Sequence, residues 1–195
     1  MIVVGIDALG LVRLSELTRF VQSDRPLSPA QARNLGAKLA DGEILVFTDA
    51  DCIPASNWLQ TIIQQINDPT ISVLGGGVNF SDNEYWSLSD NLSMFYEYLI
   101  IHRPGERRQL PSLNLAIRRN VFMDIGGFDE RYPRASGEDA DLTLRLKIKG
   151  YRLHFEPGAV VFHAPHRNRL TDMLLHAYYQ GMYSTKVDPR YLNQD

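Results

Sequence analysis

The stretch Ile44-Leu45-Val46-Phe47-Thr48-Asp49-Ala50-Asp51 decides the fold. Its four leading apolar residues have no helical period, which indicates a short buried strand. Carboxylates are costly to bury without partners, so we expect Asp49 and Asp51 to lie where the strand leaves the core. Open α/β sheets bind ligands at the carboxyl ends of strands, and two carboxylates there suit Mn²⁺ or Mg²⁺ shared with a substrate's phosphates. The spacing alone leaves open a solvated turn in which Asp51 caps the next helix.

Strands and helices are expected to alternate on both sides of this stretch. Apolar patterning, caps and Gly or Pro stops predict strands at 2–4, 43–48, 71–80, 113–117, 152–155 and 160–163. The same signals predict helices at 9–21, 29–40, 56–66 and 120–125, between Gly137 and Gly150, and at 168–185, with a long amphipathic stretch at 84–102. This alternation indicates an α/β layer fold with a mixed, mostly parallel sheet.

The composition indicates one globular domain. The chain has 195 residues and a net charge of −3, so no basic field suggests nucleic acid as a partner. Cys52 is its single cysteine, which fits a reducing compartment, and we expect a cytoplasmic location. No apolar run reaches the ~18 residues that indicate a membrane span.

A second acidic group lies at Gly137-Glu138-Asp139-Ala140-Asp141. Carboxylates in the first turn of a helix complement its dipole, which explains one or two of them. A long irregular approach, residues 129–136, delivers them as a loop that frames a site does. A carboxylate held near an acceptor hydroxyl can act as a general base.

Two further candidates are weaker when each is taken alone. His163 ends an apolar strand, and imidazole binds Mn²⁺ beside carboxylates, but a single histidine at a strand end is more often structural. Arg33 and Asn34 lie on the helix that follows a Pro-rich loop, where a solvated face is the simpler interpretation.

Taken together, the ordered motifs resemble family-2 glycosyltransferases with the GT-A, Rossmann-like nucleotide-sugar-binding fold. The matching stretches run from about residue 2 to residue 181 and are Ala32-Arg33-Asn34-Leu35-Gly36-Ala37, Ile44 to Asp51, Leu113-Asn114-Leu115-Ala116-Ile117-Arg118-Arg119, Gly126-Gly127-Phe128-Asp129-Glu130, Gly137 to Leu142, Gly150-Tyr151-Arg152-Leu153 and His163-Ala164-Pro165-His166. Each motif is weak, but the ordered set is specific. It implies one GT-A-like domain over residues 1–195, with residues 170–195 forming a final helix and tail.

The resemblance also implies a role for each motif residue. Asp51, Asp49 and His163 would hold Mn²⁺ or Mg²⁺ at the donor's diphosphate. Asp139 would deprotonate the acceptor hydroxyl, with Glu138 orienting the acceptor or the loop. The donor would contact residues in four motifs: Arg33, Asp49, Asn114 and Asp7. The family inverts the anomeric centre by direct displacement. This fits a base on one face of the sugar and a metal-stabilised diphosphate that leaves from the other face.

The N-terminal part departs from the family pattern. Family members begin with a further strand, whereas this chain begins at what resembles the second one, so the resemblance implies an N-terminally truncated sheet with a gap and exposed apolar surface. The turn that holds the nucleobase in the family reads Gly5-Ile6-Asp7-Ala8-Leu9-Gly10 here, which shifts Asp7 by one position.

Three functions follow as hypotheses. The first is an inverting, metal-dependent transfer of sugar from a nucleotide sugar, by preference a UDP-sugar, to a glycan or lipid-linked acceptor in cell-envelope polysaccharide synthesis. The second is a truncated or degenerate non-catalytic module with the same fold. The third is a nucleotidyltransferase, which the sequence does not support because it has no Gly-rich, Lys-bearing phosphate loop near the first strand. The aromatic stretch 85–98 and the last helix are simplest as core packing, with an acceptor surface or contact with a membrane as the alternatives. Peripheral contact with the inner face of a membrane and a homo-oligomer are kept as hypotheses about partners.

Overall fold

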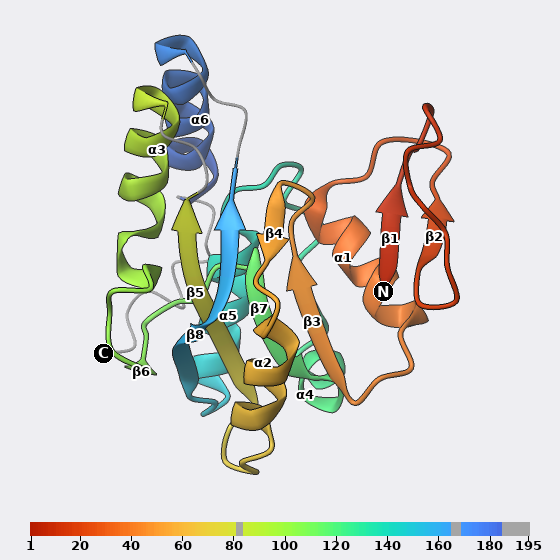
Figure 1. Cartoon of the computed structure of the whole chain (residues 1–195), viewed down its shortest axis with the longest axis vertical. Helices are drawn as coiled ribbons and strands as arrows, with labels where there is room; N and C mark the ends of the chain where they lie inside the picture. Colours follow the sequence, from red (N-terminus) through yellow and green to blue (C-terminus); the bar gives the residue numbers. More distant parts are fainter. Residues whose placement is uncertain (81–83, 165–168, 185–195) are drawn as a thin grey trace.

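The computed structural model describes residues 1–80, 84–164 and 169–184, which form an α/β structure built on two sheets (Figure 1). A two-stranded parallel sheet consists of β1 (Ile2–Gly5) and β2 (Arg19–Gln22). The larger sheet has the strand order β3-β7-β5-β8-β4, with β6 also paired to β8. Its strands are β3 (Ile44–Thr48), β4 (Cys52–Pro54), β5 (Val73–Phe80), β6 (Gly105–Glu106), β7 (Asn114–Arg118) and β8 (Leu153–His163).

The strand directions determine where a site can form. β5 and β8 pair in parallel, while β7 is antiparallel to both β3 and β5. The strands β3, β5 and β8 therefore run in the same direction, as their arrows do in Figure 1. Their carboxyl ends meet at one edge of the sheet, which is where ligands bind in this class of fold. The predicted mixed α/β sheet with flanking helices is confirmed.

Helices cover the sheet and extend beyond its carboxyl edge. They are α1 (Pro29–Leu39), α2 (Trp58–Ile66), α3 (Tyr85–Phe95), α4 (Arg119–Asp124), α5 (Glu138–Ile148) and α6 (Leu170–Ser184). α1 begins at Pro29, as predicted. Ser28 is its N-cap, and Gln31 completes a capping box with it. α3 and α6 lie side by side past the ends of β5 and β8 (Figure 1). None of the helices in the described ranges is long and apolar enough to cross a membrane.

Close packing leaves no space for side chains at the three glycines of β5. A Cβ on Gly76 would lie 2.2 Å from the carbonyl oxygen of Ala159 and 2.3 Å from Nδ2 of Asn114. The register of β5 against β8 also shifts between Gly76 and Val78. β5 therefore contains both a bulge and a close backbone approach at its glycines.

The predicted helix at 9–21 is wrong. Residues 19–22 form β2, which pairs in parallel with β1. The Asp7 carboxylate accepts the N–H groups of Leu11 and Val12, both at 2.8 Å, and so holds the chain in a turn after β1. Strand pairing and this local turn override the helical spacing of the apolar residues.

Smaller differences concern the limits of elements. The two strands predicted at 152–155 and 160–163 are one strand, β8, because Pro157 and Gly158 are accommodated at the register shift opposite β5. The stretch 84–102 divides into α3, a 3₁₀ turn at Tyr96–Tyr98 and a loop. The predicted ends of the last helix, residues 168 and 185, and the tail lie outside the described residues.

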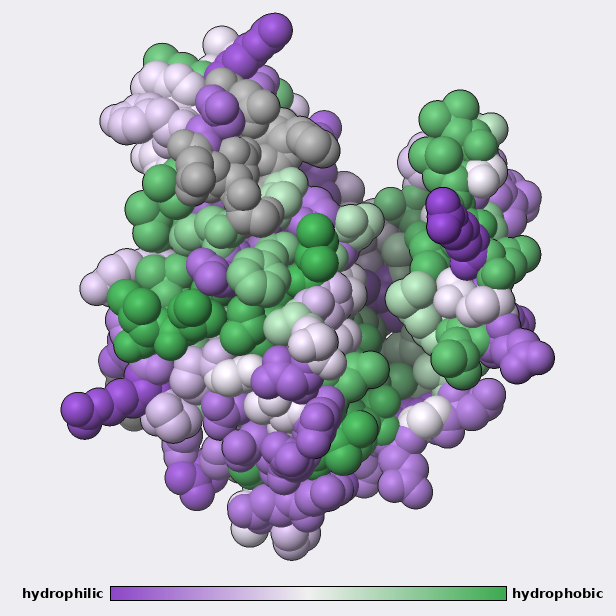
Figure 2. All heavy atoms as spheres, in the orientation of Figure 1, coloured by the Kyte–Doolittle hydropathy of each residue, from purple (hydrophilic) through white to green (hydrophobic). Residues whose placement is uncertain are grey.

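Within the described residues, the two-stranded sheet is not paired with the larger sheet, and it packs against α1. Figure 2 shows a notch between this lobe and the body of the molecule. The loop between β1 and β2 carries leucines that are 69–81% exposed, namely Leu9, Leu11, Leu14 and Leu17. A break in the sheet with exposed apolar surface, as the sequence predicts, is therefore present.

We predict that Gly76→Ala lowers the free energy of unfolding by about 2 kcal/mol or more, because its Cβ meets backbone and a buried amide that cannot move aside. Gly36→Ala in α1 is the matched control, since its Cβ would lie 3.5 Å from Val4, an ordinary contact, and alanine favours helix by about 0.5–1 kcal/mol. Urea denaturation measures both. Equal stability of the two variants would contradict the packing described for β5.

Candidate active site

Asp51 and His163 meet at the carboxyl edge of the sheet. β4 pairs antiparallel with β8 so that Cys52 lies opposite His163, and Ala164 N–H donates to the Asp51 carbonyl at 2.9 Å. This places His163 Nε2 3.5 Å from Asp51 Oδ2. The imidazole is buried and packs edge-on against Phe95, with ring centroids 5.2 Å apart. Its position is thus fixed by strand register and by α3.

The donor atoms of this pair fit a hard divalent ion. Two ligands at about 2.1 Å from one ion, at a right angle, lie about 3 Å apart, close to the separation seen here. The Cys52 sulfur also lies within 4.8 Å of both ligand atoms. Burial, with the nearby Asp49 and Asp51 carboxylates, raises the pKa of this thiol to about 12, which keeps it uncharged. A carboxylate and an imidazole with room for phosphate oxygens suit Mn²⁺ or Mg²⁺.

Arg33 links the end of β3 to the start of α5. Its guanidinium donates to Asp49 Oδ1 at 2.6 Å and to Glu138 Oε1 at 2.8 Å, and its side chain is only 11% exposed. Burial opposes its charge, but the two carboxylates outweigh burial and raise the pKa of Arg33. One buried cation therefore ties together two motifs 89 residues apart in sequence (138 − 49).

Glu138 and Asp139 hold protons more tightly than ordinary carboxyls. Burial is the main cause of the raised pKa of Glu138, followed by the Asp139 charge, and Arg33 acts against both. The pKa of Asp139 is also raised by burial, against Arg33 and the N–H groups of Ser112 and Ala140. Those N–H groups donate to Oδ2 at 3.3 Å and to Oδ1 at 2.9 Å. A carboxylate with a raised pKa is a stronger base, which is the property general-base catalysis requires.

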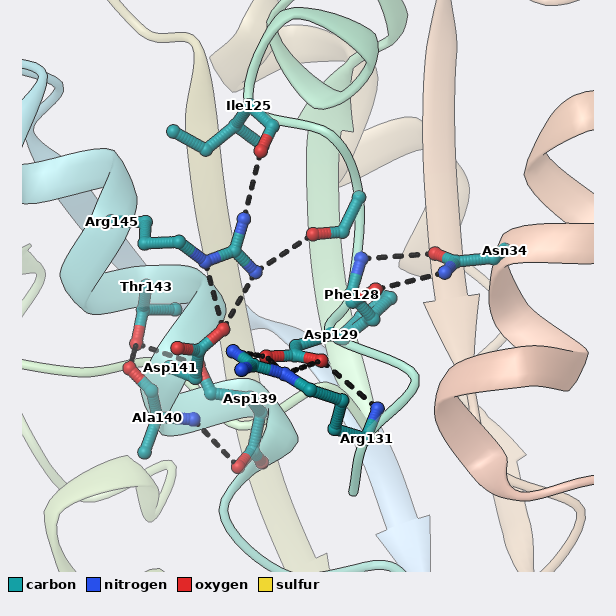
Figure 3. Close-up of polar contacts among 11 residues, drawn as sticks. Asn34, Ile125, Phe128, Asp129, Arg131, Asp139, Ala140, Asp141, Thr143 and Arg145 are labelled. Atoms are coloured by element: carbon teal, nitrogen blue, oxygen red, sulfur yellow. Dashed lines mark hydrogen bonds and ion pairs between the residues drawn. The ribbon is translucent and has the colours of Figure 1, made fainter. Parts of the chain in front are cut away.

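A turn at residues 125–128 sets the distance between α1 and α5 (Figure 3). From α1, Asn34 exchanges two 2.9 Å hydrogen bonds with the backbone of Phe128. From α5, Arg145 donates to the carbonyls of Ile125 and Gly127, each at 2.8 Å, and pairs with Asp141. Sequence reasoning missed these supporting roles, although the Gly-Gly-Phe-Asp-Glu motif is the signal that marks this turn.

Gly127 explains why this motif needs glycine. Its φ is +71°, and a Cβ there would lie 2.6 Å from Oδ1 of Asn34. A side chain would break the bonds between Asn34 and Phe128 and move α1 away from α5. Gly127 therefore supports the site by leaving space for the Asn34 side chain.

Asn114 has a structural place in the sheet. Its side chain is buried, and Nδ2 donates to the carbonyls of Gly77 and Ala159 at 2.9 and 2.8 Å. Its Oδ1 accepts the indole N–H of Trp58 at 2.9 Å. Both amide protons are used within the core, so the Asn114 side chain fastens β7 to β5 and β8. Its contact with the donor stays a prediction.

Asp7 lies in the separate two-stranded lobe. It is partly exposed and holds the turn after β1, and the N–H groups of Val12 and then Leu11 lower its pKa. Its contact with a nucleobase stays a prediction.

The remaining predicted residues form one electrostatic unit. The charges of Asp49 and Asp51 act on Cys52, and those of Asp49 and Arg33 act on Asp139. The Asp51–His163 pair, Arg33 and the Glu-Asp pair are thus connected through Asp49. Such an arrangement can hold a metal-bound anion on one side and a base on the other.

Comparison with known proteins identifies the class. The family model described as glycosyltransferase-like family 2 matches residues 11–181, so the chain belongs to this family. The pre-mycofactocin glycosyltransferase of Mycobacterium tuberculosis is 32% identical over 160 residues, covering 78% of this chain and 33% of that protein. Glycosyltransferase AglE of Haloferax volcanii is 29% identical, covering 68% and 43%. The chain therefore spans a third to less than half of these relatives.

Two solved structures support the fold assignment. The mannosyltransferase PcManGT from Pyrobaculum calidifontis, in complex with GDP-Man and Mn²⁺, has a TM-score of 0.64 and 20% identity, covering 91% of this chain and 47% of that one. GalNAc-T7 with UDP, GalNAc and Mn²⁺ has a TM-score of 0.60 and 22% identity, covering 76% and 32%. The fold of the chain is that of GT-A glycosyltransferases.

We predict that Arg33→Met lowers the free energy of unfolding by about 3 kcal/mol, because it leaves Glu138 buried without its cation. The value lies at the lower end of the range for buried pairs, since Asp49 is 34% exposed. Adding Glu138→Gln should recover part of the loss, and urea denaturation measures both variants. A loss below about 1 kcal/mol, without recovery, would show that the bridge does not hold the site together.

A second prediction concerns pH. A raised native pKa means that protonation of Asp139 stabilises the fold fully below about pH 4, and that this contribution is lost as pH rises through the native pKa. The unfolding free energy of Asp139→Asn, relative to wild type, should therefore increase from acid to neutral pH. Asp7→Asn should show the opposite slope, because the native pKa of Asp7 is lowered and its stabilisation is lost as pH falls. Parallel pH profiles for the two variants would exclude this account.

Proposed function

We propose that this chain catalyses an inverting, metal-dependent transfer of a sugar from a nucleotide sugar, by preference a UDP-sugar, to a hydroxyl of a glycan or lipid-linked acceptor. The observation that carries the proposal is the position of Asp49. Its carbonyl accepts the Cys52 N–H beside Asp51 and His163, and its carboxylate pairs with Arg33, which also pairs with Glu138 next to Asp139. Direct displacement needs a stabilised leaving group and a base on opposite sides of the reacting carbon. Family membership and the Mn²⁺ in both structural neighbours support this assignment.

In this proposal each residue has a separate task. Asp51 and His163 would hold Mn²⁺ or Mg²⁺, and the ion would supply positive charge for the diphosphate leaving group. Asp139 accepts the proton of the acceptor hydroxyl as that oxygen attacks the anomeric carbon. Arg33 fixes Asp49 and Glu138, so the carboxylates on both sides of the site keep their spacing. A carboxylate is a better general base when its pKa is raised, and burial raises the pKa of Asp139.

The alternative is a non-catalytic module with the same fold. The observation in its favour is the separate β1–β2 lobe, where the Asp7 carboxylate is occupied by backbone N–H groups. A module of this kind would keep the folded core and would not turn over a donor.

We predict that UDP binds in the presence of Mn²⁺ and that Asp51→Ala weakens this binding at least about tenfold, because the ion loses its carboxylate ligand. Isothermal titration calorimetry with UDP, with and without Mn²⁺, measures the effect. Asp172→Asn in α6 is the matched control and should bind as wild type does. No binding of UDP by the wild type under either condition would overturn the proposed function.

Turnover separates the enzyme from the module. Asp139→Asn should retain binding of UDP and Mn²⁺ but reduce donor consumption by about 10²–10⁴-fold if Asp139 is the base. Equal background rates for wild type and Asp139→Asn would favour the non-catalytic module.

A further inference from the structure

α6 contacts the backbone turn that leads into the Glu-Asp pair. The Ser136 hydroxyl donates to Gln180 Oε1 at 2.9 Å and lies 3.3 Å from the Tyr179 carbonyl. In return, Gln180 Nε2 donates to the Ala135 carbonyl at 3.3 Å. The Gln180 amide thus uses its acceptor and one donor on two successive residues of this turn. Asp139 follows three residues after Ser136.

Glycine at position 137 makes this turn sensitive to its surroundings. Gly137 is the N-cap of α5, with a φ of +88° in the left-handed region. A Cβ there would lie 2.8 Å from the Tyr132 ring and 3.1 Å from the Tyr183 carbonyl of α6. The turn is therefore enclosed between Tyr132 and α6, with no space for a side chain. A shift of α6 would be transmitted directly to the first residues of α5.

A pair formed by His176 and the buried Asp90 fixes α6 against α3. His176 Nδ1 lies 3.0 and 2.9 Å from the two carboxylate oxygens of Asp90, which is 4% exposed. Because a carboxylate accepts, Nδ1 carries the proton that it donates. His176 Nε2 lies 3.2 Å from Gln180 Nε2, which is a donor, so Nε2 accepts there.

The proton assignment is consistent along the whole chain of contacts. Each of the two amide protons of Gln180 has an acceptor, one at His176 and one at Ala135, while its oxygen accepts from Ser136. Fixing His176 by Asp90 therefore fixes the orientation of the Gln180 amide. The order of these contacts runs from α3 through α6 to the turn before α5.

We propose that Gln180 is a positioning residue that holds the turn at residues 134–137, and through it Asp139, in place for the acceptor hydroxyl; this rests on the proposed function. Gln180 does not touch the reacting atoms. It acts by keeping the turn in register with α6, which is in turn anchored by the pair of His176 and Asp90. A displacement of about 1 Å of a catalytic group can reduce turnover about a hundredfold, so this restraint matters for rate.

The test compares Gln180→Leu with Ala177→Gln, an exposed substitution on the same helix. Gln180→Leu keeps the size of the side chain and removes its polar contacts with the turn. We expect kcat to fall about 10–100-fold with KM for the nucleotide sugar within about twofold, because the metal and donor residues are untouched. Ala177→Gln should match wild type in both constants. Wild-type kcat in Gln180→Leu would overturn the proposal.

His176→Asn separates anchoring from positioning. Asparagine places an N–H near the position of Nδ1 and can keep the bond to Asp90, but it is too short to reach Gln180. It should show part of the loss in kcat while melting near the wild-type temperature. A loss of kcat that only follows the loss of melting temperature across the variants would overturn a positioning role.

Hydrogen exchange gives a readout that does not depend on activity. The amides of residues 135–139 should exchange faster in Gln180→Leu than in wild type and Ala177→Gln, measured by mass spectrometry without ligands. Unchanged exchange would overturn the proposal even if kcat falls. Should the wild type show no turnover, the proposed function fails, and faster exchange would still support the restraint of the turn by Gln180.

Discussion

The site depends on one buried cation shared by two carboxylates. Arg33 of α1 contacts Asp49 after β3 and Glu138 at the start of α5, and without it two negative groups would face each other in a poorly solvated space. The attraction is strong only because the guanidinium is largely buried, and burial by itself disfavours all three charges. This balance requires α1, β3 and α5 to be held at fixed distances, which the rest of the structure provides.

That requirement explains features which look unrelated in the sequence. Asn34 and Arg145 bind the same turn from opposite sides, so α1 and α5 are held by one segment of backbone. The glycine at 127 leaves space for Asn34, and the glycine at 76 leaves space for Asn114 within the sheet. In both places a side-chain amide joins elements that are distant in sequence. The side chains of Asn34, Asn114 and Arg145 thus hold in place the elements that carry the charged residues at the edge of the sheet.

The sequence predicts the centre of the fold better than its margins. Local rules predict the strand 44–48, the cap at Ser28 and the carboxylates at the edge. Apolar runs, helix caps and charges that avoid burial are each compatible with few local structures. The helix expected at 9–21 fails because pairing of β2 with β1 and the Asp7 turn outweigh apolar spacing.

Asn114 also shows what local rules do not predict. Its motif marks it as important, but only the fold shows that its amide is used inside the sheet. Local rules also do not predict which residues face one another across elements, as the contacts of Arg33 and Gln180 show.

The central claim is that the proposed metal-binding pair and the proposed base belong to one site. Anomalous diffraction at the manganese edge, from crystals grown with UDP and Mn²⁺, tests it most directly. The account predicts one strong peak within bonding distance of Asp51 and His163, with the diphosphate on the side facing Asp139. A peak away from these two residues, or a diphosphate on the opposite side from Asp139, would contradict it.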